Sequence, residues 1–136
     1  MENEFNFFNL KNLTEKEARK ENSQKLAFIG DAVYSLYVRN KVVLNNSCKT
    51  NELHKLTSNV VKACGQSEFV ENILQYLNEF EMEVYKRARN YKTANIAKNA
   101  KVNDYKRATG LEAIIGYLYL CGNIERINEI FGFMKD

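Results

Sequence analysis

The chain has 136 residues, of which 45% are hydrophobic, and a formal net charge of +3. This length fits one domain with a sizeable core, so we expect a single domain over residues 1–136. The absence of any run of about 18 apolar residues argues against a membrane span. The N-terminus, MENEFNFFNLKNL, carries acids where a signal peptide carries bases. We therefore predict a cytoplasmic protein with no membrane contact.

Cysteine and histidine do not indicate a disulfide framework or a zinc site. The three cysteines, Cys48, Cys64 and Cys121, are odd in number and far apart, which favours reduced thiols. The single histidine, His54, cannot build a metal cluster, and we expect it to be structural.

Apolar residues recur at helical spacing along almost the whole chain, which contains no proline. This pattern predicts an all-α fold. The predicted helices, in chain order, cover residues 13–20, 22 or 23 to 40, 50–63, 67–76, 78–89, 103–122 and 123–133. Capping residues mark several of the starts, and Gly65 is the predicted stop of the third helix. Residues 45–47 are a predicted loop, and residues 90–102 a loop or short helical turns.

Two acids stand alone in the most apolar stretches of the chain. Asp31 lies in LAFIGDAVYSLYV (residues 26–38), and Glu112 lies in ATGLEAIIGYLYL (residues 108–120). A buried ionised carboxylate is costly unless something compensates its charge. The apolar character of residues 26–38 on nearly every side predicts a central helix.

Glycines accompany both acids. Gly30 precedes Asp31, and Gly110 and Gly116 flank Glu112. Glycine weakens a helix interior, so its presence there indicates that another backbone or a ligand comes close. We expect the two helices to cross closely, with both acids facing a shared site.

The sequence allows three explanations for acids at these two positions. Each acid could reach the surface or pair with a distant Arg or Lys. The two could serve acid–base chemistry. They could also share a divalent metal, in which case oxygen ligands favour Mg²⁺ or Mn²⁺ over zinc.

Residues 86–107 form a basic segment with eight bases and one acid. Such a segment in a nearly neutral chain is typical of a surface that contacts a polyanion, although a solvated charged loop has the same composition. Beside a hard metal, it indicates phosphodiester chemistry.

The motifs LAFIGDAVYSLYVR, RARNYKT, AKNA and YKRATGLEAIIGYLYL, in this order, resemble the ribonuclease III catalytic domain. They resemble most closely its Mini-ribonuclease III branch, the short bacterial form without a double-stranded-RNA-binding domain. The resemblance implies an all-α endonuclease fold and a homodimer paired through its signature helices. It also implies Mg²⁺-dependent cleavage of double-stranded RNA, in this branch the large-subunit (23S) ribosomal RNA precursor, leaving 5′-phosphate ends.

The same resemblance assigns the site. The catalytic and metal-binding acids of the family fall on Asp31 and Glu112. The fuller ribonuclease III pattern has two further acids, and Ala27 and Thr109 occupy their positions here. Gln24 occupies the position of the glutamate that begins the longer signature motif of the family. These departures match the Mini-III branch and leave the number of metal ions open. Mg²⁺ is the expected cofactor, with Mn²⁺ as an alternative.

RNA contacts are expected from the family-like motifs of the basic segment, namely from Arg89, Lys92, Thr93, Lys98 and Asn99. The weaker candidates are Lys86, Lys101, Lys106 and Arg107. Tyr34 either supports the site edge or packs in the interface. The tyrosines expected in the core are Tyr105, Tyr117 and Tyr119.

The predicted function is thus a metal-dependent endoribonuclease, with a ribosomal protein as a possible helper. A non-catalytic RNA-binding or ribosome-associated module on the same scaffold is the alternative, favoured by the acids missing at Ala27 and Thr109. A purely protein-binding helical domain is a third reading, which the basic segment opposes.

Overall fold

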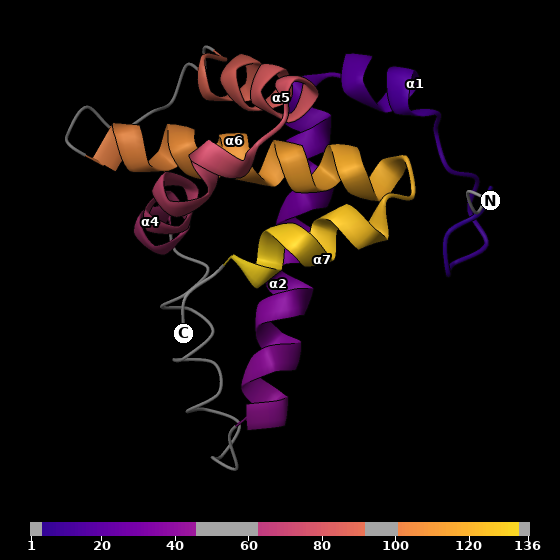
Figure 1. Ribbon diagram of the computed structural model, residues 1–136, viewed down its shortest axis with the longest axis horizontal. Coiled ribbons are helices and arrows are strands. Elements are labelled where there is room, and N and C mark those ends of the chain that lie inside the picture. Colours follow the sequence, from indigo (N-terminus) through magenta and orange to yellow (C-terminus); the bar gives the residue numbers. More distant parts are fainter. Residues whose placement is uncertain (1–3, 46–62, 92–100, 134–136) are drawn as a thin grey trace.

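The computed structural model describes residues 4–45, 63–91 and 101–133. The regular elements in these residues are helical, as predicted (Figure 1). In chain order they are α1 (Glu15–Lys20), α2 (Ser23–Asn45), α4 (Ala63–Ile73), the 3-10 helix η1 (Leu74–Tyr76), α5 (Glu79–Arg89), α6 (Lys101–Leu120) and α7 (Ile124–Gly132). None of the described helices is both long and apolar enough to cross a membrane.

Two helix starts are confirmed by their capping side chains. The Asn78 side chain accepts a hydrogen bond from the Glu81 N–H at 2.8 Å, and the Glu81 side chain accepts one from the Asn78 N–H. Asn123 accepts a hydrogen bond from the Arg126 N–H at 3.1 Å. Short polar side chains satisfy the exposed N–H groups of a first helical turn, so these boundaries are visible in the sequence.

Other predicted boundaries are wrong. Helix α2 continues past residue 40 to Asn45, and α6 begins at Lys101 rather than at residue 103. Gly65 does not stop a helix, because α4 begins at Ala63 and passes through it. The buried apolar residues of α4 pack against α6 and hold this helix together despite the glycine. Apart from residue 63, the predicted helix 50–63 lies outside the described residues.

Helix α6 is the centre of the fold. It contacts α1, α2, α4, α5 and α7, and Figure 1 shows α5 and α7 on opposite sides of it with α2 crossing it. All residues from Leu111 to Tyr119 are buried except Glu112, which is partly exposed. Tyr117 and Tyr119 are therefore in the core, as predicted. Tyr105, in contrast, is 48% exposed, so its predicted place in the core is wrong.

The crossing of α2 and α6 is a backbone contact. A Cβ added to Gly30 would lie 1.7 Å from the backbone oxygen of Glu112. A Cβ added to Gly116 would lie 1.9 Å from the backbone oxygen of Leu26. Because side chains other than hydrogen cannot fit at either point, the two glycines allow the close approach that the sequence predicted.

Helix α2 is not buried on every side, which corrects the expectation of a central helix. Phe28 is 82% exposed, and Leu36 and Val43 are each 59% exposed. These three residues lie on one side of α2, because their spacing follows the helical repeat. The chain therefore presents an apolar stripe along α2, which we call the α2 stripe.

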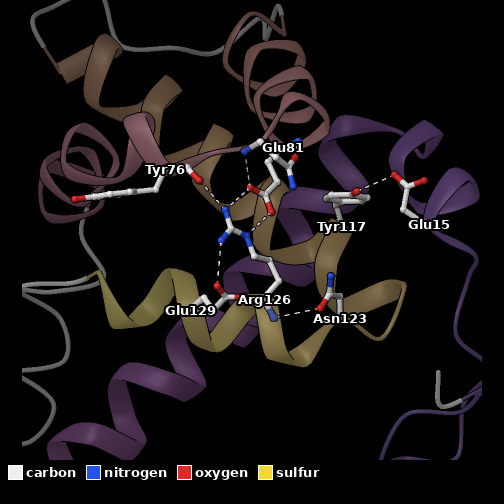
Figure 2. A network of polar contacts seen from close by, with 8 residues as sticks. Glu15, Tyr76, Glu81, Tyr117, Asn123, Arg126 and Glu129 are labelled. Atoms are coloured by element: carbon white, nitrogen blue, oxygen red, sulfur yellow. Dashed lines mark hydrogen bonds and ion pairs between the residues drawn. The ribbon is translucent and has the colours of Figure 1, made fainter. Parts of the chain in front are cut away.

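A buried ion pair joins α5, η1 and α7 (Figure 2). The Arg126 guanidinium donates to both carboxylate oxygens of Glu81, at 2.7 and 2.8 Å, and to the Tyr76 carbonyl at 2.7 Å. Glu81 is completely buried. A two-point contact of this kind compensates the buried charge and fixes the orientation of α7 against the core.

The N-terminal segment lies against the end of α6. The Leu13 N–H donates to the Leu120 carbonyl at 2.8 Å, and the Asn6 amide donates to the Tyr119 hydroxyl at 3.2 Å. Four of its apolar side chains are nevertheless largely exposed, those of Phe5, Phe7, Phe8 and Leu10.

Candidate active site

Asp31 and Glu112 meet beside the α2–α6 crossing. A hydrogen bond joins their side chains, although they are far apart in the sequence. Asp31 is exposed, which agrees with the open alternative that an acid reaches the surface, whereas Glu112 is partly buried. The predicted shared site for the two acids is therefore present in the fold.

The electrostatics of this pair are unfavourable for two negative charges. Burial, followed by the hydrogen bond and charge of Asp31, raises the pKa of Glu112 to about 9. A hydrogen bond from the Gln66 side chain acts in the opposite direction. In the metal-free protein Glu112 therefore keeps a proton at neutral pH.

The two acids open into a pocket of about 290 Å³ between α2, α5 and α6. Its lining comprises Ser23, Gln24, Ala27, Phe28, Asp31, Ala88, Arg89, Tyr91, Tyr105, Lys106, Thr109 and Glu112. Gln24, Arg89 and Thr109, all named from the sequence, are thus brought together with the acids. Ala27 and Thr109, which replace acids of the fuller family pattern, line the same pocket.

The fold places some bases of the predicted RNA-binding segment at the pocket and others in contacts within the chain. Lys106 and Arg89 line the pocket, whereas Arg107 is paired with Glu71 at 2.5 Å. Arg87 donates to the Ser23 hydroxyl and to the carbonyls of two residues near the end of α1. Arg87 and Arg107 therefore have structural contacts within the chain. Four predicted contacts lie outside the described residues, namely Lys92, Thr93, Lys98 and Asn99.

Tyr34 lies in the core of the chain and does not line the pocket. It is 1% exposed and packs its ring against Phe69 and Phe131. Burial, the neighbouring Tyr37 and the charge of Glu112 raise the pKa of Tyr34 to about 12. Its hydroxyl has no hydrogen-bond partner within the described part of the chain.

Sequence reasoning did not identify Gln66 or the aromatic part of the pocket. Gln66 is 2% exposed, and its spacing to Phe69, Val70 and Ile73 places it on the buried face of α4. A polar residue on an apolar helical face was the available signal. Tyr91 and Tyr105 line the pocket because α5 and α6 converge there, which local sequence does not reveal.

Residues 24–123 match the family profile of the ribonuclease III domain. The chain belongs to the ribonuclease III family. It is 47% identical over 119 residues to Mini-ribonuclease 3 of Clostridium tetani (strain Massachusetts / E88), covering 86% of this chain and 78% of that protein. It is 49% identical over 105 residues to Mini-ribonuclease 3 of Thermoanaerobacter sp. (strain X514), covering 77% and 74%.

The fold agrees with this assignment. The chain is similar to the crystal structure of a protein from Fusobacterium nucleatum, with a TM-score of 0.74 and 35% identity. The match covers 85% of this chain and 93% of the other. The resemblance to Mini-ribonuclease III is thus confirmed, and the chain is an endoribonuclease of the ribonuclease III type.

The donor set of the pocket fits a hard divalent cation. No group of three or more Asp, Glu, His or Cys side chains gathers anywhere in the described ranges, so the acidic side chains that this pocket offers to a cation are Asp31 and Glu112. Mg²⁺ accepts such a set because it keeps several waters. A cation between Asp31 and Glu112 would favour the ionised form of Glu112, against the burial and the neighbouring Asp31 that raise its pKa.

Proposed function

We propose that this protein is a Mg²⁺-dependent endonuclease of double-stranded RNA, with Asp31 and Glu112 as its catalytic and metal-binding residues. The observation that carries the proposal is the meeting of these two acids in the lining of one pocket, where a hydrogen bond joins their side chains. Acids held this close are stable together when a cation lies between them.

Asp31 and Glu112 would hold Mg²⁺, or Mn²⁺ in its place. When bound, the ion would polarise the scissile phosphate and activate a water molecule, which leaves a 5′-phosphate end. The exposed Asp31 carboxylate is available at the pocket surface, whereas Glu112 must release its proton before it can act as a ligand.

The bases of the pocket support binding of a phosphate backbone. Arg89 and Lys106 lie beside the two acids and lower the cost of bringing polyanionic RNA to them. Lys92, Thr93, Lys98 and Asn99 extend the same charged segment and remain predicted RNA contacts. Duplex RNA is read mainly through its shape and backbone, so we expect weak sequence specificity.

The relatives named Mini-ribonuclease 3 support a role in processing the ends of the 23S ribosomal RNA precursor in the cytoplasm. A ribosomal protein as helper belongs to the same proposal. The small size of the chain supports it, because few phosphate contacts give weak and salt-sensitive binding.

A homodimer is part of the proposal, and the α2 stripe supports it. Phe28, Leu36 and Val43 are large apolar side chains that water surrounds in the single chain. Covering them against the same face of a second copy would remove this exposure. Phe28 also lines the pocket, so the pairing would lie next to the acids.

The test is incubation of the purified protein with a long RNA duplex at low salt, with and without Mg²⁺. We expect cleavage that requires Mg²⁺ and is lost in Asp31→Asn and Glu112→Gln, while both variants still bind RNA. No cleavage of either a generic duplex or ribosomal precursor RNA by the unmodified protein, with salt-sensitive binding retained, would instead favour a non-catalytic RNA-binding module. The side chains of Ala27 and Thr109, which are not acids, are the observation in favour of that alternative.

A further inference from the structure

Gln66 is a polar residue on the buried, apolar face of helix α4. It is 2% exposed on α4, on the helix face that packs against the central helix α6. Burying an amide costs free energy unless it finds hydrogen-bond partners, so a glutamine at such a position needs a specific contact.

Its contact is the side chain of Glu112. A hydrogen bond joins the two side chains. The Gln66 amide N–H donates to it and a carboxylate oxygen of Glu112 accepts. Glu112 is thus bound from the core by Gln66 and faces Asp31 on the pocket side.

This arrangement constrains a flexible side chain. A glutamate has three rotatable bonds, and fixing one carboxylate oxygen leaves the other with few directions to point. Groups of this kind around metal ligands typically change metal affinity by about 10- to 100-fold when removed. Gln66 lies outside the pocket lining, so it acts on the pocket through Glu112.

We propose that Gln66 is a positioning residue that orients the Glu112 carboxylate toward the pocket for binding of a divalent cation. The inference rests on the proposed function and deepens it, because it adds a fourth helix, α4, to a site whose pocket is lined by α2, α5 and α6. Gln66 itself touches neither the cation nor the RNA.

The experiment measures binding of Mn²⁺ alone, by electron paramagnetic resonance, to the unmodified protein and to Gln66→Met. Methionine keeps the length of the side chain and removes the donor. We expect the dissociation constant of Mn²⁺ to rise about tenfold. RNA binding without metal should not change, and cleavage lost at limiting Mg²⁺ should recover at high Mg²⁺.

The matched control is Ser67→Ala. Ser67 is the next residue of α4, is also buried at 3% exposed, and accepts a hydrogen bond from Arg107 at 3.5 Å instead of contacting Glu112. We expect its Mn²⁺ affinity to equal that of the unmodified protein. Equal Mn²⁺ affinity in Gln66→Met and the unmodified protein overturns the positioning role.

A second readout does not depend on a folded variant. In the unmodified protein, the side-chain amide signals of Gln66 in a ¹⁵N NMR spectrum should shift on addition of Mg²⁺. Those of Gln75, exposed on η1, should not. No shift at Gln66 overturns the inference. An unmodified protein that neither binds Mn²⁺ nor cleaves RNA refutes the proposed function itself, which separates the two failures.

Discussion

The backbone of Gly30 lies directly against the backbone carbonyl of Glu112, so that a Cβ on Gly30 would come within 1.7 Å of that oxygen. This carbonyl belongs to the residue whose side chain is hydrogen-bonded to Asp31, the neighbour of Gly30. The contact that lets α2 and α6 approach each other therefore also sets the separation of the two acids. The packing of the two helices and the candidate chemistry therefore both depend on the contact between Gly30 and Glu112.

Gly30→Ala tests this dependence. The added methyl group must push α2 away from α6, and we expect a loss of about 1–3 kcal/mol or more in the free energy of unfolding. We also expect weaker Mn²⁺ binding, because Asp31 moves away from Glu112. Urea denaturation and Mn²⁺ titration measure the two effects.

The matched control for this substitution is Gly132→Ala. A Cβ at Gly132 meets nothing within 4 Å, at the end of α7. We expect this variant to be as stable as the unmodified protein or up to about 1 kcal/mol more stable, because alanine favours helix. Similar losses in both variants would contradict the role assigned to the crossing.

Glu112→Gln should stabilise the metal-free protein at alkaline pH. Folding raises the pKa of Glu112 from 4.5 to about 9, chiefly through burial. Between these values the folded state binds more protons than the unfolded state, so the free energy of unfolding falls as pH rises. Glutamine does not titrate and escapes this loss.

The measurement is thermal unfolding in EDTA at pH 4 and pH 8. We expect Glu112→Gln to melt at a higher temperature than the unmodified protein at pH 8, and the difference to be smaller at pH 4. Adding Mg²⁺ at pH 8 should stabilise the unmodified protein and leave the variant unchanged. A difference in melting temperature that does not vary with pH would refute this account.

Leu36→Lys should separate the proposed dimer into single chains. Leu36 lies in the α2 stripe at 59% exposed, and a lysine there would place a charge in the interface. Analytical ultracentrifugation measures the mass. Ile124→Lys is the control, because Ile124 is also exposed, at 46%, but lies on α7. A dimer that persists in Leu36→Lys would show that the α2 stripe is not the interface.

Lys106 and Arg107 are adjacent bases for which we expect different results. Lys106 lines the pocket, so Lys106→Ala should weaken duplex RNA binding and reduce the dependence of affinity on salt by about one counterion. Arg107 pairs with Glu71, so Arg107→Ala should leave RNA affinity nearly unchanged. Filter binding over a range of salt concentrations measures the RNA affinity of both variants. Equal losses of affinity in the two variants would argue against the pocket as the RNA site.

Arg126 does not line the pocket, and Arg126→Met should nevertheless destabilise the fold. It leaves the fully buried Glu81 carboxylate without its two-point partner, which typically costs about 3–5 kcal/mol. Glu129→Ala removes only the outer partner of Arg126, 60% exposed, and should cost about 1 kcal/mol or less. Chemical denaturation of the two variants measures both, and similar losses would contradict the assignment of stability to the Glu81 contact.

The local part of this structure was predictable from the sequence because its causes are local. The caps at Asn78 and Asn123 act within one helical turn, and the apolar periodicity acts within one helix. Gly65 misled the prediction, since a glycine stops a helix only when tertiary contacts do not carry the helix through it. The exposed stripe of α2 was also missed, because periodicity cannot separate a face buried in the core from one left at the surface.

Residue type and spacing alone predict the helical fold class, the two isolated acids and the glycines beside them. The packing of the helices, in contrast, leaves Asp31 exposed and Glu112 partly buried, and brings Gln66 of α4 to Glu112. The same packing places Lys106 at the pocket and its neighbour Arg107 in an ion pair with Glu71. The physical reason is that burial, pKa and pairing depend on which helices lie against each other, and that arrangement arises from contacts between residues distant in the chain.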